Sequence, residues 1–220
     1  MKIVSLFSGC GGLDLGLIQA GHKIVWANDF DADSVATYTQ NIGSHAVLSP
    51  IEDVLSSSIP DCDAVIGGFP CQGFSQANLL RFEDDARNRL YLEFLRVIKD
   101  KQPAYFLAEN VRGLLSIAGG RAIQKIEEDF ASAGYRVQKQ LFNVADYGVP
   151  QSRRRVIIAG TRKDMPLGQD YIYPAPTHTG SKKDMKELKP WITIGEALKG
   201  IPEPDKRHKL PRTNRHIGFQ

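Results

Sequence analysis

Residues 2–12 read KIVSLFSGCGG, an apolar and β-branched run that leads directly into a glycine-rich turn. The run predicts a short buried strand, and residues 13–20 have helical spacing that ends at Gly21. Glycines at such a junction let the backbone approach a ligand closely and leave N–H groups at the positive end of a helix. The stretch therefore predicts a strand–turn–helix unit that can hold a small molecule at its turn.

The same alternation continues along the chain. We expect further strands at residues 23–28, weakly at 45–48, and then at 62–67, 104–108, 135–143 and 155–160. Helices are expected at residues 32–41, 88–101 and 121–133. Short connections between strands and helices predict an α/β fold with a doubly wound, mostly parallel, Rossmann-like sheet. Ligands of such a sheet bind beyond the carboxyl ends of its strands.

Composition restricts the class of protein. The 220 residues are 42% hydrophobic, which excludes wholesale disorder, and no apolar run reaches the roughly 20 residues that cross a bilayer. The N-terminus has no signal-peptide pattern, so we expect a cytosolic protein without a membrane partner. The three cysteines are too few and too irregularly spaced for a disulfide framework or a metal site.

Charge divides the chain unevenly. Residues 1–150 carry 13 basic and 18 acidic side chains, whereas residues 151–220 carry 15 and 7, together with 7 of the 12 prolines. On charge alone, a polyanion-binding edge and a solvated tail explain the basic end equally well. Because the periodicity fades after about residue 160, we expect a catalytic domain over residues 1–160 and a basic, proline-rich extension over 161–220.

Polar candidates follow the ends of successive strands. Asp29 lies 20 residues after Gly9, where a carboxylate can accept the hydroxyls of a ribose; a tight turn without a ligand is the alternative. Cys71 lies in a polar, glycine-containing segment after the strand at 62–67, where a thiolate can act as a nucleophile. Glu109 ends the next strand. Strand alternation places Arg153 and Arg155 on one face, where guanidiniums can hold a carbonyl or a phosphate.

These residues closely resemble the C5-cytosine DNA methyltransferase family. The resemblance covers about residues 1–160 and is carried by the following segments, in the family's order: Phe7–Gly12, Asp29-Phe30, Phe69-Pro70-Cys71-Gln72 with Phe74-Ser75, Asp85–Leu90, Glu109-Asn110-Val111 and Gln151–Val156. It implies an enzyme that transfers a methyl group from S-adenosylmethionine to C5 of a cytosine in double-stranded DNA, leaving S-adenosylhomocysteine. A bacterial restriction–modification role, in the bacterial cytosol or at the nucleoid, is the corresponding expectation.

The resemblance also assigns roles to residues. Cys71 would add to C6 of a flipped-out cytosine, Glu109 would bind its N3 and amine edge, and Arg155 and Arg153 would orient the base and Glu109. The implied cofactor residues are Phe7, Gly9, Gly11, Gly12, Leu13, Asp29, Phe30, Ile51, Gly68, Pro70 and Leu90. The implied substrate contacts are Pro70, Gln72, Ser75, Asn110, Val111 and Gln151. No metal is implied.

Two departures from the family pattern stand out. The family usually has an acid just before the Ile51 position to accept the adenine amine, and here Pro50 occupies it. Glu52, Asp53 or the backbone alone are the candidates to replace it. The family's target-recognition region and its final cofactor-pocket segment do not follow within residues 1–220, so we expect a second polypeptide or a longer chain to supply them. A tRNA methyltransferase and a non-catalytic subunit of a split enzyme are the competing interpretations.

Overall fold

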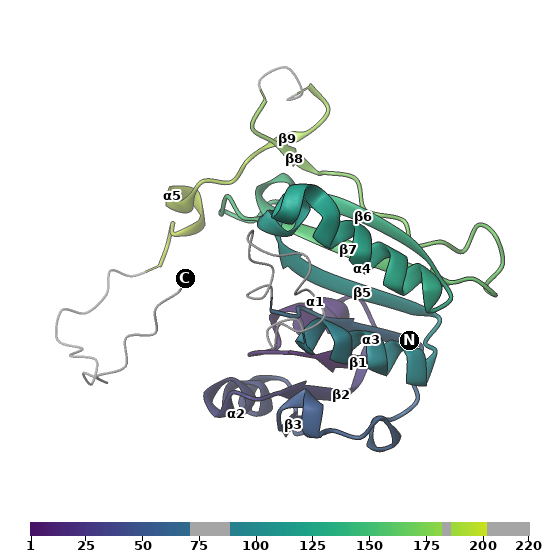
Figure 1. The fold of residues 1–220 in the computed structure, drawn as a ribbon. Helices are drawn as coiled ribbons and strands as arrows, with labels where there is room; N and C mark the ends of the chain where they lie inside the picture. Colours follow the sequence, from purple (N-terminus) through teal and green to yellow (C-terminus); the bar gives the residue numbers. More distant parts are fainter. Residues whose placement is uncertain (71–88, 182–185, 202–220) are drawn as a thin grey trace.

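The computed structural model describes residues 1–70, 89–181 and 186–201. In these ranges the chain forms a seven-stranded sheet with the strand order β3-β2-β1-β4-β5-β7-β6 (Figure 1). The strands are β1 (Lys2–Leu6), β2 (Lys23–Asp29), β3 (Ala46–Leu48), β4 (Ala64–Gly67), β5 (Tyr105–Val111), β6 (Tyr135–Asn143) and β7 (Arg154–Arg162). Strands β1 to β5 are parallel, and β7 runs antiparallel to both β5 and β6. The predicted α/β, mostly parallel sheet is confirmed.

Helices cover both faces of the sheet. They are α1 (Gly12–Gln19), α2 (Ala32–Asn41), α3 (Arg89–Lys101), α4 (Arg121–Ser132) and the short α5 (Ile194–Ala197). Single turns of 3-10 helix connect them at Ile51–Asp53, Ser56–Ser58, Arg112–Leu115, Ile117–Gly120 and Val144–Tyr147. The chain goes from β1 outward to β3 and then returns to β4 on the other side of β1. The strand order thus reverses between β1 and β4, the position at which doubly wound sheets bind their ligands.

Two apolar clusters hold these layers together. On one face, buried side chains of α3 and α4 pack on β1, β4, β5 and β7, with Phe106 and Phe130 in contact at 4.4 Å between ring centroids. On the other face, Tyr38 and residues of α1 and α2 pack on β1, β2 and β4. The buried apolar area on both faces is the main driving force for folding. It fixes the positions of the strand ends.

One strand is longer than the sequence predicts. The predicted strand at 104–108 continues to Val111 as β5, because its backbone pairs with β7 along its whole length, from Tyr105↔Thr161 to Val111↔Arg155. Polar residues end the apolar pattern at Glu109, but a ladder of backbone hydrogen bonds depends on the neighbouring strand rather than on side-chain polarity. Glu109 therefore projects from a paired strand and not from a loop.

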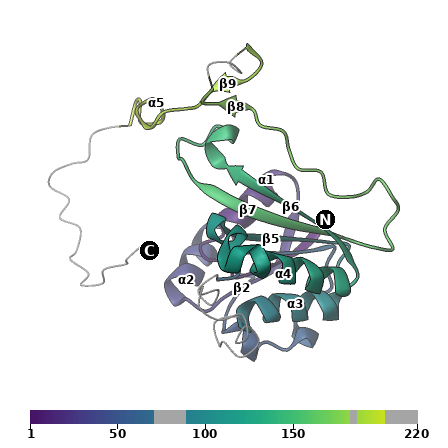
Figure 2. The same ribbon diagram turned by 45° about the horizontal axis from the view of Figure 1, so that its top comes forward.

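The extension begins on the sheet and then leaves it. The backbone N–H of Tyr171 donates to Thr161 at 3.2 Å, and the hydroxyl of Tyr173 donates to the carbonyl of Ile157 at 3.0 Å. Beyond these contacts, the two-residue strands β8 (His178–Thr179) and β9 (Lys189–Pro190) pair with each other and lie away from the sheet, as does α5 (Figure 2). The predicted boundary at residue 160 stays a prediction, although the chain through Tyr173 packs on the sheet.

Two kinds of feature do not occur within residues 1–70, 89–181 and 186–201. Within them, no helix combines the length and the apolar content that a membrane crossing requires. In the same ranges, no three His, Cys, Asp or Glu side chains lie close enough together to share a metal ion.

Candidate active site

The glycine turn after β1 adopts an unusual backbone conformation. Phe7, Gly9 and Gly11 all have positive φ angles, of 54°, 54° and 84°. Such angles are natural for glycine and rare for a residue with a Cβ atom, so Phe7 is a strained position. A Cβ atom on Gly11 would also lie only 2.2 Å from the side chain of Ile42. The turn thus requires glycine at position 11 for both conformation and space.

Asp29 lies beside this turn, at the end of β2. One of its carboxylate oxygens accepts from the backbone N–H of Gly9 at 2.8 Å and the other from the N–H of Asp31 at 3.0 Å. A carboxylate has about four acceptor positions, so each oxygen can still accept a hydroxyl. The next residue, Phe30, has 68% of its surface exposed. The sequence prediction of an acid and an aromatic ring beside the turn is consistent with this arrangement.

A cavity of about 300 Å³ opens where β1, β4 and β5 end. It is lined by Ser5, Leu6, Phe7, Ser8, Leu13, Asp14, Gly67, Gly68 and Glu109. Four residues predicted from the sequence therefore meet here, the cofactor candidates Phe7, Leu13 and Gly68 and the catalytic candidate Glu109. The cavity joins the two halves of the predicted site.

Glu109 is held from two sides. Its carboxylate forms an ion pair with Nε of Arg155 at 2.8 Å, and the two side chains remain 30% and 23% exposed. On the other side lies Gly68, where a Cβ atom would come within 3.1 Å of Oε2. The ion pair joins β5 to β7, and the glycine leaves room for the carboxylate. The carboxylate is thus held by one ion pair while part of it faces solvent.

Of the two arginines predicted to share this face, Arg155 is paired with Glu109, whereas the role of Arg153 stays a prediction. Arg153 precedes β7, and its backbone bonds to Gln151 and Val144 while its side chain is exposed. In the described part of the chain, Arg155 is the arginine paired with Glu109. Alternation requires a continuous strand, and β7 begins only at Arg154.

Asn110, which the resemblance implies as a substrate contact, is buried and forms hydrogen bonds within the protein. It is only 2% exposed, its amide donates to the carbonyl of Phe69 at 3.0 Å, and its Oδ1 accepts the N–H of Val111 at 2.8 Å. The side chain thus ties the end of β5 to the residue before Pro70. Val111 and Gln151 are exposed and Pro70 is half-buried. The predicted residues Cys71, Gln72 and Ser75 lie outside the described residues.

The segment after β3 is fixed by a residue that the sequence analysis missed. Ile51 is buried, and the guanidinium of Arg96 donates to the carbonyls of Ile51 at 3.1 Å and Val54 at 3.0 Å. Leu90, also in α3, is half-buried against the same core. A helical arginine carries no local sign of such a role, because these two carbonyls lie more than 40 residues away in the sequence. Glu52 and Asp53 are both exposed, so either carboxylate can face a ligand.

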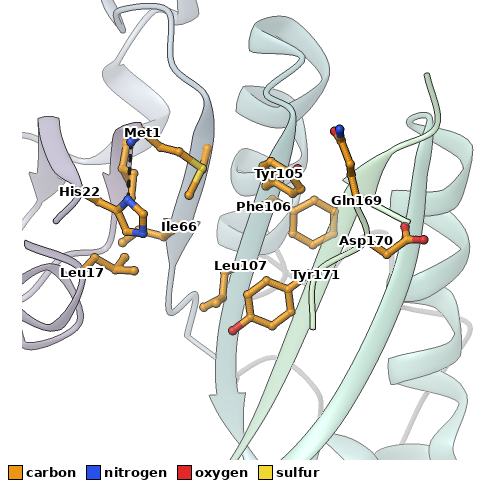
Figure 3. Close-up of a pocket in the computed structure, with 12 residues that line it drawn as sticks. Met1, Leu17, His22, Ile66, Tyr105, Phe106, Leu107, Gln169, Asp170 and Tyr171 are labelled. Atoms are coloured by element: carbon orange, nitrogen blue, oxygen red, sulfur yellow. Dashed lines mark hydrogen bonds between the residues drawn. The ribbon is translucent and has the colours of Figure 1, made fainter. Parts of the chain in front are cut away.

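A second cavity, of about 340 Å³, contains none of the predicted site residues. It lies over the first residues of β1 and β5. Figure 3 shows Met1, Leu17 and His22 on one side and Gln169, Asp170 and Tyr171 on the other, with Tyr105 and Leu107 of β5 between them. Its lining is mainly apolar, and it includes neither Glu109 nor any residue of the glycine turn. The candidate active site is the smaller cavity.

Known proteins are similar to this chain in sequence and in fold. The family model of the C-5 cytosine-specific DNA methylase matches residues 1–218. The chain is 46% identical over 211 residues to the Type II methyltransferase M.NgoFVII of Neisseria gonorrhoeae, covering 95% of this chain and 55% of that protein. It is 43% identical over 202 residues to M.FnuDI of Fusobacterium nucleatum, covering 91% and 58%. The chain thus spans little more than half the length of these relatives.

Solved structures agree with the sequence relatives. A DNA modification methyltransferase encoded within a prophage of Escherichia coli superimposes with a TM-score of 0.72 and 30% identity, covering 93% of this chain and 56% of that one. The Dnmt2 methyltransferase of S. pombe shares the fold, with a TM-score of 0.60 and 23% identity over 76% of this chain and 51% of that one. With the family model matching nearly the whole sequence, the chain belongs to the C-5 cytosine-specific DNA methylase family.

Proposed function

We propose that this chain forms the cofactor-binding and catalytic part of a DNA cytosine-C5 methyltransferase that uses S-adenosylmethionine. The observation that carries the proposal is the cavity at the ends of β1, β4 and β5, which the glycine turn and Glu109 both line. The relatives named Type II methyltransferases support a role in a restriction–modification system, and hence a place in the cytosol with the DNA. Since the chain covers about half of each relative, DNA recognition is proposed for the whole protein.

The residues around the turn fit this cofactor. Backbone N–H groups at the start of α1 suit the carboxylate of its amino-acid part, and Asp29 suits the ribose hydroxyls. The exposed ring of Phe30 offers a stacking surface for the adenine. Gly68 and Pro70 would lie beside the amino-acid part, which places it near Glu109. When bound, the cofactor supplies an electrophilic methyl group on a positively charged sulfur.

Glu109 and Arg155 form the base-binding side. A carboxyl group at this position can hydrogen-bond N3 and the exocyclic amine of a cytosine, and it stabilises charge that develops on the ring during attack at C6. The guanidinium of Arg155 keeps the carboxylate pointing into the cavity. Asn110 acts indirectly, because it holds the backbone of Phe69, two residues before the proposed nucleophile.

Cys71 is the proposed nucleophile. Its thiolate adds to C6 of cytosine, which raises the electron density at C5 and makes that carbon reactive toward an electrophilic methyl group. After loss of the C5 proton, elimination of the thiolate restores the ring and the enzyme. A cytosine inside a duplex cannot reach such a site, so the nucleotide must first leave the stack.

The test is covalent trapping on a fluorinated base. Duplex DNA of mixed sequence with 5-fluorocytosine in place of cytosine is incubated with the protein and S-adenosylmethionine. Because fluorine at C5 cannot leave as a proton does, the adduct persists, and peptide mass spectrometry should find it on Cys71. Cys71→Ser is the matched control and should give no adduct. Methyl transfer to tRNA but not to DNA, or full activity of Cys71→Ser, would overturn the proposal.

A further inference from the structure

Asp14 is a buried acid directly below the glycine turn, and the proposed function does not use it. It lies in the first turn of α1 and is only 1% exposed. One carboxylate oxygen accepts from the hydroxyl of Ser5 in β1 at 2.7 Å, and the other accepts from the hydroxyl of Tyr38 in α2 at 2.7 Å. A single carboxylate therefore joins the strand before the turn, the helix after it and the neighbouring helix.

Burial and hydrogen bonding shift the pKa values of both Asp14 and Tyr38. Burial raises the pKa of Asp14, and the bonds from Ser5 and Tyr38 act in the opposite direction by favouring its ionised form. Burial and the nearby Asp14 raise the pKa of Tyr38, so its hydroxyl keeps its proton and donates it. That hydroxyl also lies 3.0 Å from Nε2 of His45. A buried polar network of this kind restricts its elements to one arrangement.

Tyr38 supports the turn with its ring as well. A Cβ atom on Gly11 would lie 2.8 Å from two ring carbons of Tyr38, so the backbone of the turn packs directly against this ring. The turn contains a strained residue, Phe7, with its φ angle of 54°. Strain of this kind persists only where surrounding contacts hold the backbone in place.

Resting on the proposed function, we propose that Asp14 and Tyr38 are positioning residues that hold the glycine turn in its cofactor-binding shape. The hydrogen bonds among Ser5, Asp14 and Tyr38 join β1, α1 and α2 directly below the turn. The ring of Tyr38 blocks movement of the turn toward α2. The turn is then ready before the cofactor arrives. Such preorganisation raises affinity because binding does not have to order the loop.

The test removes one oxygen atom. Tyr38→Phe keeps the ring against Gly11 but leaves Asp14 without one of its two donors. Binding of S-adenosylhomocysteine, measured by calorimetry, should weaken about 10-fold, the size expected when a bond to a buried charged group is lost. In methyl-transfer assays the KM for S-adenosylmethionine should rise by a similar factor while kcat stays within about threefold.

Tyr135→Phe is the matched control. Tyr135 is also fully buried, and its hydroxyl donates to the carbonyl of Pro103 at 2.8 Å, at the opposite end of the sheet. Both variants lose a buried hydroxyl, so both lose stability, but Tyr135→Phe should change the cofactor Kd less than about twofold. Hydrogen exchange of the backbone amides of residues 8–13 without cofactor should accelerate in Tyr38→Phe alone.

Each possible result either supports or contradicts the inference. Equal Kd values for the two variants, or unchanged exchange in the turn of Tyr38→Phe, overturn it and leave the proposed function standing. If Tyr38→Phe does not fold, Ser5→Ala removes the other donor to Asp14 and is read by the same criteria. If the unsubstituted protein binds no S-adenosylhomocysteine, the proposed function itself fails and the inference fails with it.

Discussion

Asp29 and Glu109 are two carboxylates at the same edge of the sheet, and the protein holds them in different ways. Asp29 is buried and bonded to two backbone N–H groups, those of Gly9 and Asp31. Glu109 is 30% exposed and is held by one side chain, that of Arg155. Backbone donors cannot turn away, whereas a guanidinium on a flexible stem can. The comparison indicates a rigid side at the proposed cofactor turn and, at the proposed base-binding carboxylate, a side that can adjust around an incoming substrate.

The largest expected effect is the fall in kcat caused by Glu109→Gln, which distinguishes the two sides of the site. Glu109→Gln keeps the shape of the side chain but removes its charge and its transferable proton. We expect kcat for methyl transfer to fall about 10²–10³-fold, as when a transition-state donor is lost. Because the cofactor turn is held by other contacts, the Kd of S-adenosylhomocysteine should stay within about twofold of the unsubstituted value.

The control for this substitution is Glu127→Gln, which breaks an ion pair between α4 and β6, with Lys139 at 2.6 Å. It should leave both kcat and the cofactor Kd unchanged. Glu109→Gln with normal kcat would show that Glu109 does not act on the base. A large loss of cofactor affinity in the same variant would contradict the division into two sides.

The second prediction concerns the rigid side. Gly11→Ala introduces a Cβ atom at a φ of +84°, in contact with Ile42 and Tyr38. We expect the cofactor Kd to rise about 100-fold and Tm to fall by about 5–10 °C, because both the strain and the overlap must be relieved by moving the turn. Calorimetric titration and thermal unfolding measure the two effects.

Gly16→Ala, in the helix that follows the turn, offers the matched comparison. No atom lies within 4 Å of a Cβ at this position, and its φ is not positive. Alanine favours a helix over glycine by about 0.5–1 kcal/mol, so this variant should be slightly more stable and bind cofactor normally. If Gly11→Ala behaved like Gly16→Ala, the turn would be adaptable and the comparison between the two sides would lose its basis.

Sequence reasoning located the features that depend on local pattern. The strand at 2–6, the glycine turn and the helix after it follow from apolar spacing and from glycine chemistry, and the structure confirms them. The family resemblance implies that Arg155 orients Glu109, and the structure shows the two side chains as an ion pair. The resemblance, rather than the local pattern, carries that prediction.

Long-range polar contacts were beyond that reasoning. Asp14 was not predicted as a positioning residue, because its partner Tyr38 lies 24 residues away on another helix. Arg96 looked like one more charged residue on an amphipathic helix, although it bonds to two backbone carbonyls. Such contacts depend on how helices pack across a face of the sheet, and a single sequence does not contain that information.

The smallest expected effect is that of Asp31→Ala, which tests whether the backbone or the side chain of Asp31 holds Asp29. Asp31 donates its backbone N–H to Asp29, while its own side chain accepts the N–H of Ser34 as the N-cap of α2. Asp31→Ala keeps the backbone donor and removes only the cap. We therefore expect an unchanged cofactor Kd and a Tm lowered by about 2–4 °C at pH 7, as for the loss of one N-cap.

The pH dependence identifies the origin of this small loss. Hydrogen bonds from Ser34 lower the pKa of Asp31 below its usual value of 3.8, so the folded protein favours the ionised carboxylate. The stabilisation is therefore complete above about pH 4 to 5 and disappears as the pH falls through the lowered pKa. The difference in Tm between the unsubstituted protein and Asp31→Ala should shrink between pH 7 and about pH 3. A weaker cofactor Kd in Asp31→Ala would mean that the side chain, and not the backbone, fixes the rigid side.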